Sequence, residues 1–142
     1  TVSLKDFKEI CGVPGASKSA VRQVSHAFVG QNNNDDGKEF KGRRRLLVVS
    51  DDGKARVFDV TGEGKAELHQ EVKATKNEGR LIGGMFLQNG SRLVTCAANG
   101  EIKVFSATKS EIKLELEGRA NVEQLTGMDV HPNGRYAIVC GS

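Results

Sequence analysis

Apolar and polar side chains alternate along several short stretches of the chain. Residues 92–97 form an apolar run, a turn follows at 98–100, and alternation resumes from 101 to 105. The stretch EIKLELEG at 111–118 alternates Ile and Leu with charged residues, so we expect an outer strand with one solvated face. A spacing of two indicates β-strands rather than helices.

Small turn dipeptides separate these stretches. The chain has 17 Gly and only 2 Pro, and several of the glycines follow Asp or Asn. These pairs are Asp52-Gly53, Asn89-Gly90, Asn99-Gly100 and Asn133-Gly134. Such pairs supply the positive φ of tight hairpin turns. The chain therefore reads as mostly β, with further strands predicted at 20–28, 65–74, 80–86 and 124–130.

An internal repeat organises the predicted strands. Residues 44–60 align with 91–107 at a spacing of 47, and residues 132–142 align with 88–98 at a spacing of 44. This period is close to the ~40 to 45 residues of a four-stranded propeller blade. We therefore predict an all-β fold, with about two and a half β-propeller blades of four antiparallel strands.

The repeat divides the chain into four predicted parts. Residues 1–19 are a loop or the end of a preceding blade, and 20–76 are a blade with a polar and basic insertion at 30–45. Residues 77–118 are a second blade, and 119–142 are the first half of a third. An open half blade exposes unpaired strand edges, so we also expect a longer parent chain or self-association.

Two segments carry a resemblance to a known family. SDDGKARVFDV at 50–60 resembles the turn and third strand of a WD40 repeat, and FLQNGSRLVTCAANGEIKVFSA at 86–107 resembles the stretch that precedes and enters it. The resemblance assigns structural roles to five residues, namely Asp52, Phe58, Asp59, Asn99 and Phe105. It implies a non-catalytic scaffold that binds protein partners in a large assembly, with a ribonucleoprotein as one setting.

The chain also departs from the WD40 pattern. It has no Trp, the pair Phe105-Ser106 replaces a Trp-Asp pair, and the Gly-His before the first strand is missing. The buried hydrogen-bond network typical of WD40 blades therefore cannot be complete. We expect simple packing to hold these blades together.

Composition and charge indicate in which compartment the protein works, but they do not indicate its function. Basic residues exceed acidic ones by only three, and no apolar run approaches the roughly 20 residues that a membrane span needs, so we expect no membrane partner. The three cysteines, Cys11, Cys96 and Cys140, form no C-x-x-C pair. We expect a reducing, nuclear or cytoplasmic location, with Cys96 and Cys140 as small buried groups.

The segment CGVPGASKSA at 11–20 resembles a phosphate-binding loop in which Ser17 replaces the last glycine. Such a loop works when a buried strand delivers it to a helix N-terminus. The preceding residues, LKDFKEIC, are too charged for that strand, and the following ones belong to a predicted blade. We expect a surface connection with Lys18 exposed, and keep nucleotide binding as a remote alternative.

A basic run closes the polar insertion at 30–45. We name Lys41, Arg43, Arg44 and Arg45 as candidate contacts for RNA or for an acidic protein surface. The alternative is an ordinary solvated loop, because Asp35, Asp36 and Glu39 lie close by in the sequence.

Catalytic chemistry finds little support in the residues. The three histidines have no metal-ligand spacing, and no nucleophile, base and acid set can be assembled, so we predict no catalytic residue, metal or cofactor. A rival hypothesis remains, since HPNGRYAIVCGS at 131–142 is similar to repeats of lactonase-like propeller enzymes. There, channel-side turns would supply Asp51, Asp52 and Asn99.

Overall fold

The computed structural model describes residues 17–29, 43–60, 65–75, 79–87, 90–107 and 111–142. Within these ranges, ten strands form three antiparallel sheets of four, four and two strands. The first sheet contains β1 (Val21–Val29), β2 (Arg43–Ser50), β3 (Lys54–Val60) and β4 (Ala66–Lys73). The second contains β5 (Leu81–Leu87), β6 (Arg92–Ala97), β7 (Glu101–Ala107) and β8 (Ile112–Arg119). The third contains β9 (Leu125–Val130) and β10 (Ala137–Gly141).

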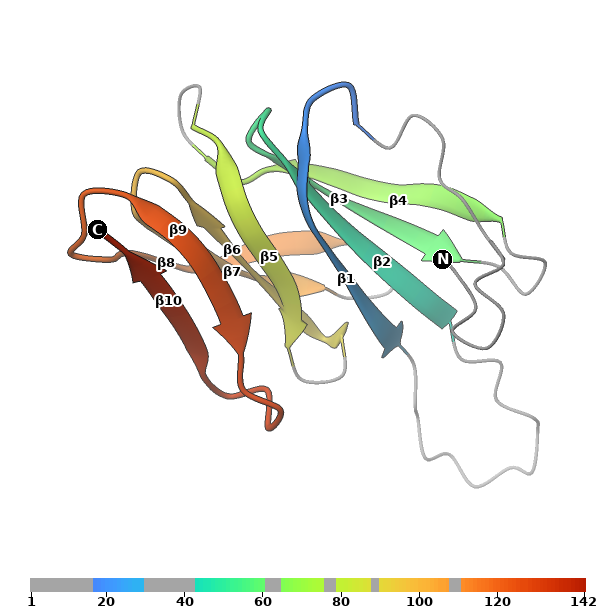
Figure 1. Cartoon of the computed structure of the whole chain (residues 1–142). Coiled ribbons are helices and arrows are strands. Elements are labelled where there is room, and N and C mark those ends of the chain that lie inside the picture. Colours follow the sequence, from blue (N-terminus) through green and yellow to red (C-terminus); the bar gives the residue numbers. More distant parts are fainter. Residues whose placement is uncertain (1–16, 30–42, 61–64, 76–78, 88–89, 108–110) are drawn as a thin grey trace, which may run out of the picture.

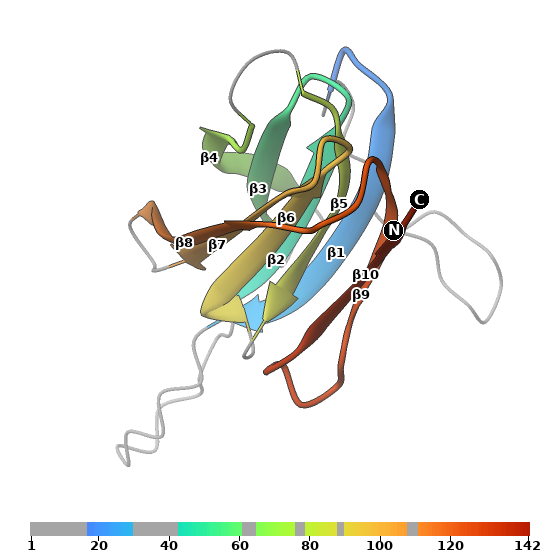
Figure 2. The ribbon, with the colours of Figure 1, turned by 90° about the vertical axis from the view of Figure 1, so that its left-hand side faces the viewer.

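Each sheet is a meander in which strands pair in the order of the sequence. The first strands of the three sheets lie next to one another, with β5 between β1 and β9 (Figure 1). The fourth strands, β4 and β8, lie on the opposite side of the molecule (Figure 2). This radial arrangement is that of propeller blades around an axis, which confirms the predicted fold class.

The tight turns recur at equivalent positions of the repeat. The side-chain oxygen Oδ1 of Asp52 accepts a hydrogen bond from the amide of Lys54, and Oδ1 of Asn99 does the same for Glu101. The glycine between each pair has a positive φ, 76° at Gly53 and 92° at Gly100. Asx turns closed by a left-handed glycine are what the dipeptides predicted.

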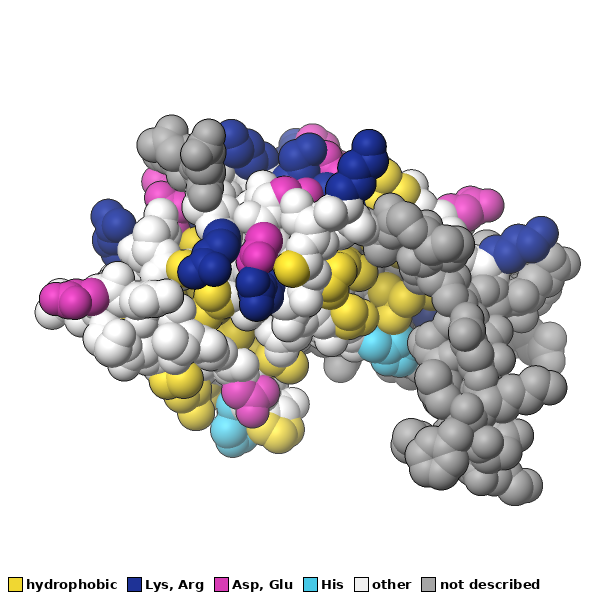
Figure 3. Space-filling view, turned by 45° about the horizontal axis from the view of Figure 1, so that its top comes forward, with side chains coloured by type: hydrophobic (Ala, Val, Ile, Leu, Met, Phe, Trp, Pro, Cys, Tyr) yellow, Lys and Arg dark blue, Asp and Glu magenta, His cyan; other side chains and the backbone are white. Residues whose placement is uncertain are grey.

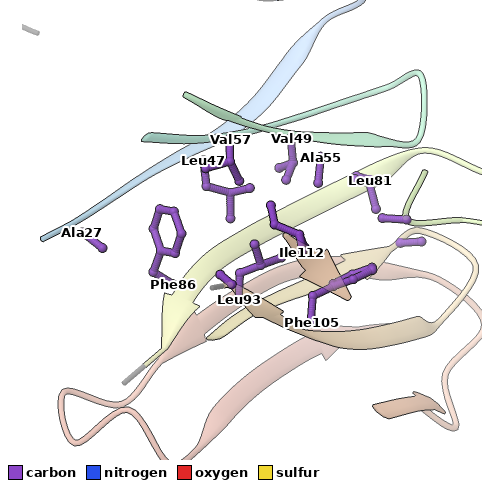
Figure 4. Close-up of a cluster of buried hydrophobic side chains, with 13 residues drawn as sticks. Ala27, Leu47, Val49, Ala55, Val57, Leu81, Phe86, Leu93, Phe105 and Ile112 are labelled. Carbon is purple, nitrogen blue, oxygen red and sulfur yellow. The ribbon is translucent and has the colours of Figure 1, made fainter. Parts of the chain in front are cut away.

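The main hydrophobic core lies between the first and second sheets (Figure 4). Leu47 and Val49 of β2 face Leu93 of β6 and Phe105 of β7, and all four are buried. Alternation places these side chains on the faces that meet. Burial of each such side chain contributes about 1.5–3 kcal/mol, so this contact fixes one sheet on the other.

The second sheet approaches the first closely at Gly84 of β5. A Cβ atom placed on Gly84 would lie 2.5 Å from Cγ1 of Val49, which is itself fully buried. Glycine is therefore required here by the lack of space.

The opposite face of the first sheet holds a smaller buried cluster of Leu46, Val48 and Phe58. Because Leu46 and Leu47 are consecutive and both buried, β2 is covered on both faces. Strands of this kind read as continuous apolar runs, as residues 46–49 do.

The outer strand β8 differs from the prediction of one dry and one solvated face. Ile112 is buried, but Leu114 and Leu116 are 49% and 65% exposed. All residues of β8 after Ile112 are exposed, so nothing described covers either face of this outer strand there. A β-bulge also shifts its register, because Leu114 pairs with Phe105 whereas Leu116 pairs with the adjacent Val104. Partners on opposite faces of β7 leave the two leucines on opposite faces of β8.

The sheets occupy residues 21–73, 81–119 and 125–141. Because β2 begins at Arg43, the last three residues of the insertion predicted at 30–45 belong to a strand. In the part of the chain that the structure describes, no helix is long and apolar enough to cross a membrane.

Candidate interaction site

A charged network surrounds the turn between β2 and β3. Oδ1 of Asp52 accepts a hydrogen bond of 2.6 Å from the Ser50 hydroxyl, and Oδ2 of Asp52 accepts one of 2.5 Å from Nη2 of Arg56. Arg56 also donates through Nε to Glu71 of β4, at 2.7 Å. Lys54 contacts the other Glu71 oxygen at 2.8 Å. The network thus ties β2, β3 and β4 together at one end of the sheet.

The network sets the ionisation of its carboxylates. Burial alone would raise the pKa of Asp52, but hydrogen bonds from Arg56, Ser50 and the Lys54 amide outweigh it and lower the pKa to about 2. The pKa of Glu71 is lowered mainly by its hydrogen bond from Lys54, and that of Asp51 mainly by its hydrogen bond from Arg22. All three groups are held as carboxylates.

Three further segments meet at this end of the first sheet. The amide of Asp51 donates to the carbonyl of Ala20 before β1, and the amide of Ala74 after β4 donates to the carbonyl of Gly53, both at 2.9 Å. Gly79, just before β5, accepts a hydrogen bond of 2.9 Å from the Thr75 hydroxyl. Charged side chains from four separate parts of the sequence are therefore neighbours.

The second sheet carries a simpler version of this turn. Arg119 of β8 donates from Nε and Nη2 to the carbonyl oxygen of Asn99, at 3.2 and 2.9 Å. Phe105, which occupies a Trp-like position in the repeat, is buried in the main core. Asn99 has a polar turn role, as Asp52 does in the first sheet, but without the ion pair.

Arg45 was predicted as a partner contact, and the structure corrects this. Its side chain is only 1% exposed, and its Nε donates to Oδ1 of Asp59 at 2.8 Å. Nη2 of Arg45 lies 3.3 Å from Nε2 of His69, whose Nδ1 lies 3.5 Å from Asp59 Oδ2. Arg45 and Asp59 are directly opposite on β2 and β3, so the buried guanidinium has its counter-charge in the sheet.

The other members of the basic run fall in different environments. Lys41 lies outside the described residues, and Arg43 begins β2. Arg44 is exposed and has interactions of its own. The candidate contact formed by this run stays a prediction for Lys41, Arg43 and Arg44.

Phe58, which precedes Asp59 in the Phe-Asp pair of the repeat, is buried in the smaller hydrophobic cluster.

Polar side chains also lock the two large sheets together, which the expectation of simple packing missed. Oε1 of Gln23 accepts a hydrogen bond of 3.0 Å from the Gly84 amide, and the Ser25 hydroxyl accepts one of 3.2 Å from the Phe86 amide. On the outer side, Gln70 of β4 accepts from the Ile112 amide at 2.6 Å and donates to the Ile112 carbonyl at 3.2 Å. Strand alternation predicts that Gln23 and Ser25 lie on the same face of β1, but no local sequence pattern predicts that they bind the amides of Gly84 and Phe86.

The phosphate-loop alternative is not supported at the residues that can be described. Residues 11–16 lie outside the described ranges, but Ser17 to Ala20 lead directly into strand β1. The Ser17 hydroxyl accepts the Ser19 amide at 3.1 Å, and Lys18 is exposed. A strand does not present the row of free amides with which a helix N-terminus binds phosphate. The helix that the nucleotide-binding hypothesis requires is therefore replaced by a strand in residues 17–29.

The cysteines and histidines take different roles. Cys96 is buried, and burial, with a smaller effect of Cys140, raises the pKa of its thiol to about 11. Cys140 is exposed, contrary to the prediction that it is a small buried group. His131 packs edge-on against Tyr136, with ring centroids 6.5 Å apart. No group of three or more metal-ligating side chains occurs among the described residues.

Comparison with solved structures supports the class of protein that the sheets define. The chain is similar to the β-propeller domain of Cps50 (Swd1) from Myceliophteria thermophila, with a TM-score of 0.57 and 18% identity. The match covers 68% of this chain and 33% of that one, so this chain spans about a third of that domain's length. At this identity the likeness shows the fold, a β-propeller. No family model and no curated protein matches the sequence.

Proposed function

We propose that this chain is a non-catalytic, WD40-like propeller scaffold that binds protein partners in a multi-subunit assembly. The observation that supports it most is the double connection between the first two sheets, through the core and through Gln23, Ser25 and Gln70. Sheets fixed in this way hold the connecting turns in place. Rigid turns on a repeated framework form a pre-organised surface for another protein.

The enzymatic alternative is weakened by what its residues do. Asp51 and Asp52 form ion pairs with Arg22 and Arg56, and the side-chain oxygen of Asn99 is engaged by a backbone amide. These groups close turns and join strands, so they are occupied within the fold. We therefore place the partner-binding function ahead of lactonase-like chemistry.

Purification of the tagged protein from its own cells at native abundance tests the proposal. After nuclease treatment, we expect other proteins to elute with it from size exclusion in a fixed molar ratio, measured by quantitative mass spectrometry and light scattering. Nuclease sensitivity of that complex would instead indicate a ribonucleoprotein contact. Recovery of the protein alone or only as copies of itself would refute a role in a multi-subunit assembly.

A further inference from the structure

One end of the first sheet carries a concentrated excess of positive charge, which we call the basic patch. It comprises Lys18, Arg22, Lys54, Arg56, Lys73 and Arg80. The hydrogen bonds of Asp51 to Ala20 and of Ala74 to Gly53 bring its segments together. Figure 3 looks onto this end, where Lys and Arg side chains gather with acidic side chains between them.

The charge of the patch accounts for the charge of the whole chain. Six basic side chains surround three carboxylates, those of Asp51, Asp52 and Glu71, which leaves an excess of three. The formal net charge of the chain is also +3, so the rest of the chain is neutral in sum. The stretches 1–16 and 76–78 lie outside the described residues, and each contains equal numbers of basic and acidic residues.

All three carboxylates of the patch form salt bridges within the chain, whereas only three of its six basic side chains do. Asp51 pairs with Arg22, Asp52 with Arg56, and Glu71 with both Arg56 and Lys54. Within the described part of the chain, no salt bridge is formed by the three remaining basic residues, which are Lys18, Lys73 and Arg80. These side chains are exposed and available to an external anion.

The pairing of two lysines across neighbouring strands also favours binding of an external anion. Lys54 and Lys73 are direct partners across β3 and β4. Like charges directly opposite each other on a sheet repel. Glu71 offsets the charge of Lys54, whereas Lys73 has no such neighbour among the described residues. A carboxylate from outside the chain would complete this charge arrangement.

We propose that the basic patch binds an acidic, Asp- or Glu-rich segment of a protein partner, an inference that rests on the proposed scaffold function. An extended segment with acids at alternate positions directs them to one side, toward several cations at once. Nucleic acid fits this surface less well. Its own carboxylates repel a phosphate backbone. Phe58, Phe86, Phe105 and Tyr136 are the Phe and Tyr residues whose side chains the structure describes, and none of them lies in the patch to stack with bases.

Fluorescence anisotropy with a labelled peptide of alternating Glu and Ser tests this inference on the full chain. We expect binding that weakens as the ionic strength rises toward ~0.15 M. The double variant Lys73→Glu/Arg80→Glu should weaken binding at least tenfold, and Lys73→Gln/Arg80→Gln should give a smaller loss. Arg135→Glu is the matched control, because this exposed arginine lies in the turn between β9 and β10, far along the chain from the patch.

Several results would overturn the inference. These are no peptide binding by the wild-type chain, an equal loss in the Arg135→Glu variant, and binding of an oligouridylate of equal length more tightly than the peptide. Thermal unfolding of each variant verifies that it is folded. If partner proteins co-purify equally with wild type and with Lys73→Glu/Arg80→Glu, the acidic contact is refuted while the scaffold function stands.

Discussion

Replacing Asp52 with Asn is expected to remove a pH-dependent part of the stability of the first sheet. The side-chain amide introduced at this position can still accept hydrogen bonds from the Ser50 hydroxyl and the Lys54 backbone. It cannot pair its charge with Arg56, whose guanidinium is mostly buried against Asp52 and Glu71. The substitution therefore separates the ion pair from the shape of the turn.

The magnitude follows from the pKa of Asp52. The value falls from an ordinary 3.8 to about 2 because the hydrogen bonds and charge of Arg56 and the other donors outweigh the effect of burial. At 1.36 kcal/mol for each pKa unit, the carboxylate contributes about 2 kcal/mol. Since the pKa is lower in the folded chain, this contribution is present above about pH 4. It is lost as the pH falls toward 2.

Urea unfolding of wild type and Asp52→Asn between pH 7 and pH 2 measures the effect. We expect the variant to be less stable by about 2 kcal/mol at pH 7, and the difference to shrink toward zero near pH 2. Asp129→Asn, at an exposed carboxylate on β9, should stay within about 0.5 kcal/mol of wild type. A difference between wild type and Asp52→Asn that is constant with pH would refute the assignment of the stabilisation to this ion pair.

Three further substitutions test the contacts between and within the sheets. Gly84→Ala should lower the free energy of unfolding by about 1–3 kcal/mol, because its Cβ meets a buried valine, whereas Gly118→Ala meets nothing within 4 Å and should be tolerated. Gln70→Leu should cost about 1–3 kcal/mol in the same urea assay, since two backbone groups of β8 lose their partner. Asp59→Ala should lower the midpoint of thermal unfolding strongly, with a loss of about 3 kcal/mol or more, because it leaves the buried Arg45 without its carboxylate. A Gly118→Ala effect equal to that of Gly84→Ala, or neutral results at Gln70 and Asp59, would contradict these contacts.

The local part of the fold could be predicted from the sequence. Asp52-Gly53 and Asn99-Gly100 require a positive φ and supply their own turn acceptor, so the hairpins are encoded within four residues. Because residues 44–60 align with 91–107 at a spacing of 47, a hairpin predicted in one copy is also predicted at the equivalent position of the other. The environment of Arg45 could not be read in this way, because its burial depends on Asp59 in the neighbouring strand. The basic stretch at 41–45 suggested an exposed arginine at position 45, whereas the pairing of β2 with β3 places Arg45 beside Asp59.

The basic patch, like the environment of Arg45, could not be predicted from local sequence. Lys54 and Lys73 become neighbours through the pairing of β3 with β4, which includes a bulge that shifts the register. Lys18 precedes the first sheet and Arg80 directly precedes β5 of the second, and both come near the turn because Ala20 contacts Asp51 and Gly79 lies against Gly53. No local pattern contains this geometry. A predicted register for β3 and β4 was the one signal that could have placed two of the lysines together.

The links from Gln23, Ser25 and Gln70 end on main-chain atoms of the second sheet. Main-chain groups are the same for every amino acid except proline, which lacks the amide hydrogen. Changes at the exposed side chains of β8, and at positions of β5 other than the tightly packed Gly84, therefore leave these three attachment points in place, provided that the strands keep their course. The first sheet can tolerate sequence drift in its neighbour while remaining attached to it, and the loops of that neighbour are free to diversify.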